Sequence, residues 1–89
     1  MTKKRIFILT DWYEPGYKAG GTIQSCRNFV AAMRENYEIS VLTSDRDLGD
    51  AEGYPEIPSG QWVVREPGVP VYYAKRENVN IRLLKGMIE

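Results

Sequence analysis

The residues best suited to chemistry lie in one glycine-rich stretch, EPGYKAGGTIQSCRNFVAAM, which runs from Glu14 to Met33. Its second half has the apolar spacing of an amphipathic helix, and the adjacent glycines Gly20 and Gly21 stand where that helix begins. The N-terminus of a helix carries partial positive charge and N–H groups without helical partners, and glycine lets a ligand come close to them. The stretch therefore predicts either an anion site, with phosphate as the natural ligand, or only a turn of the chain.

Two nucleotide-binding motifs come close to this stretch without matching it. The interval from Gly16 to Gly21 is that of a P-loop, but Thr22 stands where the motif needs the lysine that reaches the β- and γ-phosphates. A dinucleotide site would place an acidic residue about where Asp45 lies, yet the G-x-G-x-x-G fingerprint is absent and the loop is too long for its tight turn. Both classes of site are disfavoured on these grounds.

A second polar stretch, DRDLGDAEGYPE, has some of the residues of a calcium-binding loop. Asp45, Asp47 and Glu56 stand at ligand positions, but Gly49 replaces another ligand and Asp50 stands where the loop needs its invariant glycine. A metal site is therefore not predicted. The charges that open this stretch are either solvated loop residues or contacts to a polar ligand.

Strands and helices must hold these two stretches in place. A β-branched and aromatic run at residues 5–10 predicts a strand buried on both faces, and residues 37–44 predict a second one. A helix begins between them near Thr22, a suitable N-cap, so that strand, helix and strand form a right-handed βαβ unit. The loops at residues 11–21 and 45–61 both leave carboxyl ends of strands, where open parallel sheets bind ligands, so they should line one crevice.

The rest of the chain predicts a hairpin and one more helix. The runs WVVR and VPVYYA read as two strands, with Pro67 and Gly68 at the centre of a type II turn, and Asn80 can cap the last helix. The predicted fold class is α/β, with a Rossmann-like parallel sheet flanked by helices and a small β-hairpin insertion. These elements leave such a sheet incomplete, so we expect residues 1–89 to be the N-terminal part of a longer protein.

Composition narrows the classes of function. The 89 residues suffice for one small domain, and 12 basic residues balance 12 acidic ones, so no overall charge favours nucleic acid or an anionic membrane. Histidine is absent and Cys26, an expected core residue, is the single cysteine. A disulfide within the chain, the usual zinc sites and histidine-dependent triads are thereby excluded. The apolar run at residues 6–9 is too short for a signal peptide and no segment has transmembrane length, which predicts a cytoplasmic protein.

The order of these stretches resembles the N-terminal domain of glycosyltransferase family 4 enzymes. The resemblance covers nearly the whole chain and rests on two stretches: TDWYEPGYKAGGTIQSCRNFVAAM, whose proline and glycine pair lead into the first helix, and SDRDLGD after the second strand. It implies the GT-B fold, with two Rossmann-like halves, and a retaining, metal-independent transfer of a sugar. The donor would be a nucleotide-diphosphate-sugar, and the acceptor a glycan, a lipid-linked sugar or a small molecule. No cofactor is implied, and the parent enzyme could touch a membrane peripherally.

By position, the resemblance places the donor diphosphate near the backbone of Gly20 and Gly21, with Thr22 opening the helix. It implies acceptor contacts for four further residues, which are Lys18, Asp45, Arg46 and Asp47. The family's catalytic residues, among them a glutamate pair separated by seven residues, belong to the second half, so the fragment alone should be inactive. The alternative is a noncatalytic module that binds an anion or a nucleotide, or that self-associates through an open sheet edge.

Overall fold

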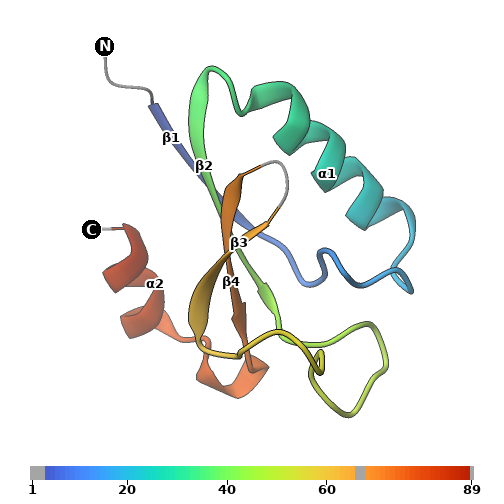
Figure 1. Ribbon diagram of the computed structural model, residues 1–89. Helices are drawn as coiled ribbons and strands as arrows, with labels where there is room; N and C mark the ends of the chain where they lie inside the picture. Colours follow the sequence, from blue (N-terminus) through green and yellow to red (C-terminus); the bar gives the residue numbers. More distant parts are fainter. Residues whose placement is uncertain (1–3, 66–67, 89) are drawn as a thin grey trace.

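The computed structural model describes residues 4–65 and 68–88, which form a small α/β domain (Figure 1). The strands are β1 (Lys4–Leu9), β2 (Tyr37–Ser44), β3 (Gln61–Arg65) and β4 (Val69–Ala74). The helices are α1 (Gly21–Met33) and α2 (Ile81–Ile88), preceded by a short 3-10 helix, η1 (Arg76–Asn78). The predicted strands, hairpin and helices are all present, while Pro67 of the predicted type II turn lies outside the described residues.

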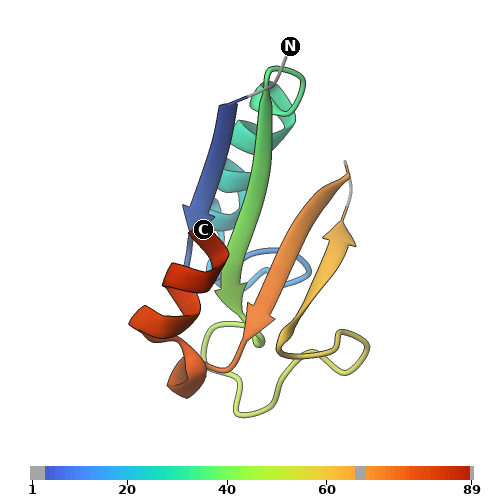
Figure 2. The same cartoon turned by 90° about the vertical axis from the view of Figure 1, so that its left-hand side faces the viewer.

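The four strands form one mixed sheet in the order β1-β2-β4-β3. β1 pairs with β2, and β2 with β4, in parallel, whereas β3 pairs with β4 antiparallel because a short hairpin joins them. The hairpin is thus no separate insertion, since its second strand is the third parallel strand of the sheet. Helices α1 and α2 lie on opposite faces of the sheet (Figures 1 and 2), an arrangement compatible with the Rossmann-like class.

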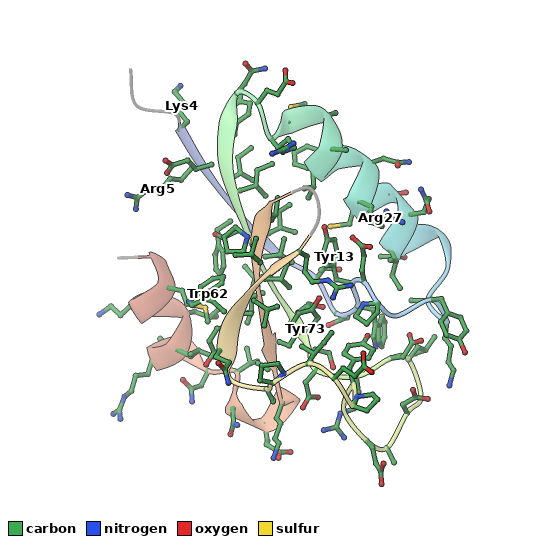
Figure 3. All side chains as sticks on the ribbon, viewed as in Figure 1. Lys4, Arg5, Tyr13, Arg27, Trp62 and Tyr73 are labelled. Carbon is green, nitrogen blue, oxygen red and sulfur yellow. The ribbon has the colours of Figure 1, made fainter. Side chains whose placement is uncertain are left out.

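The core lies between the sheet and α1. Alternate residues of a strand share one face, so Val41 of β2 and Val71 of β4, which are paired in the sheet, both face α1 and are fully buried with its Val30. Tyr13, from the loop after β1, and Tyr73 of β4 belong to the same buried cluster and point into the interior (Figure 3). The loop after β1 is therefore anchored in the core by one of its own side chains. Cys26 is half-buried against the same cluster, as predicted.

Helix α1 begins one residue before the predicted cap. Its N-cap is Gly20, with φ 64° and ψ −120°, and no side chain caps the helix, so the prediction of Thr22 as the N-cap is wrong. The carbonyl of Gly20 accepts hydrogen bonds from the amides of Ile23, at 3.1 Å, and Gln24, at 3.3 Å. In α2, by contrast, the predicted cap is confirmed, because Oδ1 of Asn80 accepts a hydrogen bond from the Leu83 amide at 2.9 Å.

Within residues 4–65 and 68–88, neither helix has the length and apolar content needed to cross a membrane.

Candidate functional site

A cavity of about 910 Å³ opens over the carboxyl ends of the three parallel strands. The residues that line it are Leu9, Thr10, Asp11 and Trp12 at and after β1, Thr22 in the first turn of α1, Leu42, Thr43, Ser44, Arg46, Asp47, Gly49 and Asp50 at and after β2, and Ala74, Glu77 and Val79 at and after β4. Its volume lies within the range of small-molecule sites, about 300–1,000 Å³. Both predicted loops contribute to it, so the expectation that they line one crevice is confirmed.

The predicted residues take different places around this cavity. Thr22, Arg46 and Asp47 line it. Gly20, Gly21, Lys18 and Asp45 are not among the lining residues. Gly21 and Asp45 are sequence neighbours of lining residues, and Lys18 is paired with the lining residue Asp50. The two loops are thus brought together as expected, with the first turn of α1 at the rim of the cavity.

The two adjacent glycines differ in what the backbone demands of them. Gly20 has a φ of +64°, which side chains with a Cβ rarely adopt, so the turn itself requires glycine there. Gly21 has no such backbone angle, and a Cβ added to it would meet nothing within 4 Å. Neither the turn nor the packing explains the missing side chain of Gly21.

The first turn of α1 is electrostatically open to an anion. It contains no acidic residue, and its amides receive no side-chain cap. Nε of Arg27, in the second turn of α1, pairs with the carboxylate of Glu14 at 3.2 Å (Figure 3 shows Arg27). The positive end of the helix is therefore not neutralised by a side chain of its own first turn.

Asp47 is buried and holds the two loops together. Its carboxylate accepts hydrogen bonds from the amides of Tyr17 at 3.0 Å, Lys18 at 3.2 Å and Leu48 at 2.8 Å, and only 4% of the residue is exposed. Burial would raise the pKa of Asp47, but these hydrogen bonds outweigh it and lower the pKa below its ordinary value. The carboxylate predicted to contact an acceptor therefore has main-chain partners within the protein.

Asp45 is also buried, and side chains rather than amides donate hydrogen bonds to it. It is 4% exposed, and its carboxylate accepts hydrogen bonds from Nε of Arg46 at 2.9 Å and from Oγ of Ser59 at 3.1 Å. Burial opposes ionisation, but the hydrogen bonds from Arg46 and Ser59 prevail and lower the pKa of Asp45. Arg46 also donates to the carbonyl of Ala51, so its guanidinium braces the second loop while it lines the cavity. The interpretation of these charges as solvated loop residues is wrong for both carboxylates.

Lys18 lies on the outside of the site. Its ammonium is paired with the carboxylate of Asp50, and both side chains are partly exposed. The hydrogen bond from this partner raises the pKa of Lys18. Because Asp50 lines the cavity, the pair joins the tips of the two loops across its rim.

Gly16 is required by packing. In the sequence it stands out only because its spacing from Gly21 is that of a P-loop. A Cβ at this position would lie 2.5 Å from the Tyr54 hydroxyl, 2.9 Å from Oδ1 of Asp47 and 3.0 Å from the carbonyl oxygen of Tyr13. Burial, with the charge of Asp47 next, raises the pKa of Tyr54 to about 12, so its hydroxyl stays protonated. The Tyr54 ring meets the buried ring of Tyr73 edge-on, with centroids 5.9 Å apart. The first loop thus rests directly against the second.

Thr43 is a further cavity residue that the sequence did not single out. It is 3% exposed, and its hydroxyl oxygen has no hydrogen-bond partner among the residues that the structure describes. It lies inside the run YEISVLTS, which the sequence already explains as a buried strand, so no pattern drew attention to it.

Among residues 4–65 and 68–88, no three cysteine, aspartate or glutamate side chains gather in a way that could hold a metal ion. Comparison of the chain with known protein families, with curated proteins and with solved structures gives no match.

Proposed function

We propose that this chain is the N-terminal, acceptor-side part of a retaining glycosyltransferase with the GT-B fold. The parent enzyme would transfer a sugar from a nucleotide-diphosphate donor to an acceptor, without a metal ion. The observation that carries the proposal is Gly21, whose missing side chain is required by neither backbone nor packing and which begins a helix without a side-chain cap. A diphosphate is an anion that suits such a helix start, and it is also the leaving group whose charge must be stabilised.

The remainder of the cavity suits a hydroxyl-rich acceptor. Carboxylates accept hydrogen bonds from sugar hydroxyls, and Asp50 and Glu77 both line the cavity. Trp12 adds an aromatic surface that can cover the apolar face of a sugar ring. Within the proposal, Arg46 keeps its acceptor role, whereas Asp45 and Asp47 act through the loops that they hold. Lys18 would contact only an acceptor that extends beyond the rim.

Under this proposal, the catalytic groups belong to the donor-binding half of the parent enzyme and not to residues 1–89. Residues at the first turn of α1 would hold the diphosphate, exclude water from one side and stabilise the charge that develops on the leaving oxygen. The cytoplasmic location and any peripheral membrane contact of the parent stay predictions.

The binding half of the proposal is tested with Gly21→Val. UDP titrated into the chain should shift the amide NMR signals of Gly21, Thr22 and Ile23, and the variant should bind UDP about tenfold more weakly. That loss corresponds to one charge-assisted hydrogen bond of about 1.5 kcal/mol. Gly86→Val is a matched control, because Gly86 is also helical, has nothing within 4 Å of an added Cβ and does not line the cavity. Equal UDP binding by both variants would contradict the proposal.

The enzymatic half is tested by the coding sequence that follows codon 89. The proposal expects further strands of this sheet and then a second α/β half with two glutamates seven residues apart. A stop codon immediately after Glu89 would remove the enzyme and leave only a small anion-binding domain.

The noncatalytic alternative has one specific observation in its favour. Within residues 4–65 and 68–88, strand β1 is an edge of the sheet that pairs only with β2, and its Leu9 is 55% exposed. Edge strands of this kind invite pairing with another chain. Light scattering over a hundredfold range of concentration distinguishes the two cases, since a self-associating module should change its mass and a monomer should not.

A further inference from the structure

Thr43 has a polar group that the fold leaves without a partner. The residue is 3% exposed, and its hydroxyl oxygen neither donates nor accepts a hydrogen bond in the described part of the chain. Buried hydroxyls are paired in most proteins because an unpaired one loses its hydration without replacement. A valine would fill the same space without that loss, so packing alone does not explain the threonine.

The position of Thr43 points to the cavity. It stands one residue before the end of β2 and lines the cavity together with Thr22 of the first turn of α1. By strand alternation it shares the face of Ile39 and Val41, which is the face that α1 covers. An unpaired hydroxyl and an uncapped helix start, two independent features, thus border the same space.

A rotation about one bond of Thr43 changes the direction in which its hydroxyl points. A turn of about 120° about the Cα–Cβ bond takes the threonine side chain to another staggered rotamer, in which the hydroxyl occupies the place that the methyl group or the hydrogen on Cβ held before. The hydroxyl oxygen is buried as the side chain now stands, so a ligand must draw it round to reach it. Because no hydrogen bond holds the present rotamer, the turn breaks none.

We propose that Thr43 is a ligand-binding residue whose hydroxyl turns toward the cavity and donates a hydrogen bond to a phosphate oxygen. The same phosphate accepts hydrogen bonds from the first amides of α1. A phosphate is favoured over a neutral hydroxyl because the first turn of α1 carries no acidic residue or side-chain cap. The assignment of this phosphate to a nucleotide-sugar rests on the proposed function, whereas the subsite requires only an oxyanion.

Thr43→Val tests this assignment through two readouts of opposite sign. Without ligand, the variant should have a thermal midpoint about 4–8 °C higher, since it loses an unpaired buried hydroxyl and keeps its shape. Its affinity for inorganic pyrophosphate and for UDP, measured by calorimetry, should fall about fivefold to tenfold. Thr43→Ser keeps the hydroxyl and should restore most of the binding.

Thr10→Val provides the contrast within the same cavity. The Thr10 hydroxyl already donates to the Trp12 carbonyl at 3.2 Å, so this variant should have a lower thermal midpoint than the wild type. Comparison of Thr10→Val with Thr43→Val distinguishes a hydroxyl that stabilises the fold from one that is available to a ligand.

The outcomes decide the two proposals separately. The ligand role of Thr43 is overturned if Thr43→Val binds pyrophosphate as tightly as the wild type, has a lower thermal midpoint or fails to fold. It is also overturned if the wild type binds no pyrophosphate. If UDP binding depends on Gly21 but not on Thr43, the proposed function stands and this inference falls. If pyrophosphate binds through Thr43 and UDP binds no better, the phosphate subsite stands and the nucleotide-sugar assignment falls.

Discussion

Replacing Asp47 with alanine is expected to lower the free energy of unfolding by about 2–4 kcal/mol and to release the loop before α1. The carboxylate accepts hydrogen bonds from the amides of Tyr17, Lys18 and Leu48, and the variant leaves all three without that acceptor. Hydrogen bonds to a charged group are worth about 1.5–3 kcal/mol each, and water will replace some of them once the side chain is removed. Urea denaturation measures the loss.

Two further variants show whether the carboxylate itself matters. Asp47→Asn keeps one oxygen acceptor but turns an NH₂ group toward main-chain donors, so its stability should fall between that of Asp47→Ala and the wild type. Asp50→Ala removes an exposed partner of Lys18 and should leave stability almost unchanged. Amide exchange of Tyr17 and Lys18 should quicken in the Asp47 variants alone. Equal stability of Asp47→Ala and Asp50→Ala would contradict the linking role of Asp47.

The contribution of Asp47 also depends on pH in a defined direction. Its pKa in the folded chain is lowered below the ordinary value of 3.8, as is that of Asp45, because hydrogen bonds outweigh burial. A group with a lowered folded pKa stabilises the fold above its unfolded pKa and loses that effect as the pH falls through the folded one. The difference in unfolding free energy between wild type and Asp47→Ala should therefore be full above about pH 5 and shrink below about pH 4. A difference that is constant from pH 2 to pH 7 would contradict this.

The second large effect is expected for Gly16→Ala, which should cost about 2–3 kcal/mol of stability. The added methyl group would lie 2.5 Å from the Tyr54 hydroxyl, 2.9 Å from a carboxylate oxygen of Asp47 and 3.0 Å from the carbonyl oxygen of Tyr13. None of these atoms can retreat easily, because Tyr54 packs on buried Tyr73, Asp47 is fixed by its amides, and the third atom belongs to the backbone. Thermal denaturation of the variant measures the effect.

Removal of the Tyr54 hydroxyl shows whether its contact with the added methyl group causes the loss of stability. Tyr54→Phe removes the closest of the three atoms, so Gly16→Ala should cost less in the Tyr54→Phe background than in the wild type. Gly21→Ala is the matched control, since its methyl group would meet nothing within 4 Å. If both glycine variants lose the same stability, backbone freedom rather than packing explains the need for glycine at position 16.

Local patterns predicted the elements of this fold well. The strand at Tyr37–Ser44 has its predicted bounds, because alternating Ile39 and Val41 mark a face that is buried on α1. The start of α1 was misplaced because two local devices compete there, a threonine cap and a glycine with positive φ, and the sequence does not show which one the chain uses. The mixed character of the sheet depends on which strand β4 joins, and that pairing is not local.

The site was predicted in outline but not in its contacts. Thr22, Arg46 and Asp47 stand around the cavity because the ends of parallel strands meet at one edge, which the strand order implies. Two of the three partners of Asp47, the amides of Tyr17 and Lys18, lie about thirty residues earlier in the chain, and no side-chain pattern records main-chain donors. Thr43 was missed for a related reason, since a missing hydrogen bond appears only once every neighbour has been placed.

The way in which Asp47 binds the first loop also determines how related sequences can vary. Its donors at positions 17 and 18 are main-chain N–H groups, and the Tyr17 side chain is 76% exposed. Every amino acid except proline brings the same donor to these positions, so evolution is free to replace both side chains without loss of these hydrogen bonds. Position 47 has no such freedom, because the acceptor there is the side chain itself. Homologues should therefore diverge at 17 and 18 while they retain aspartate at 47.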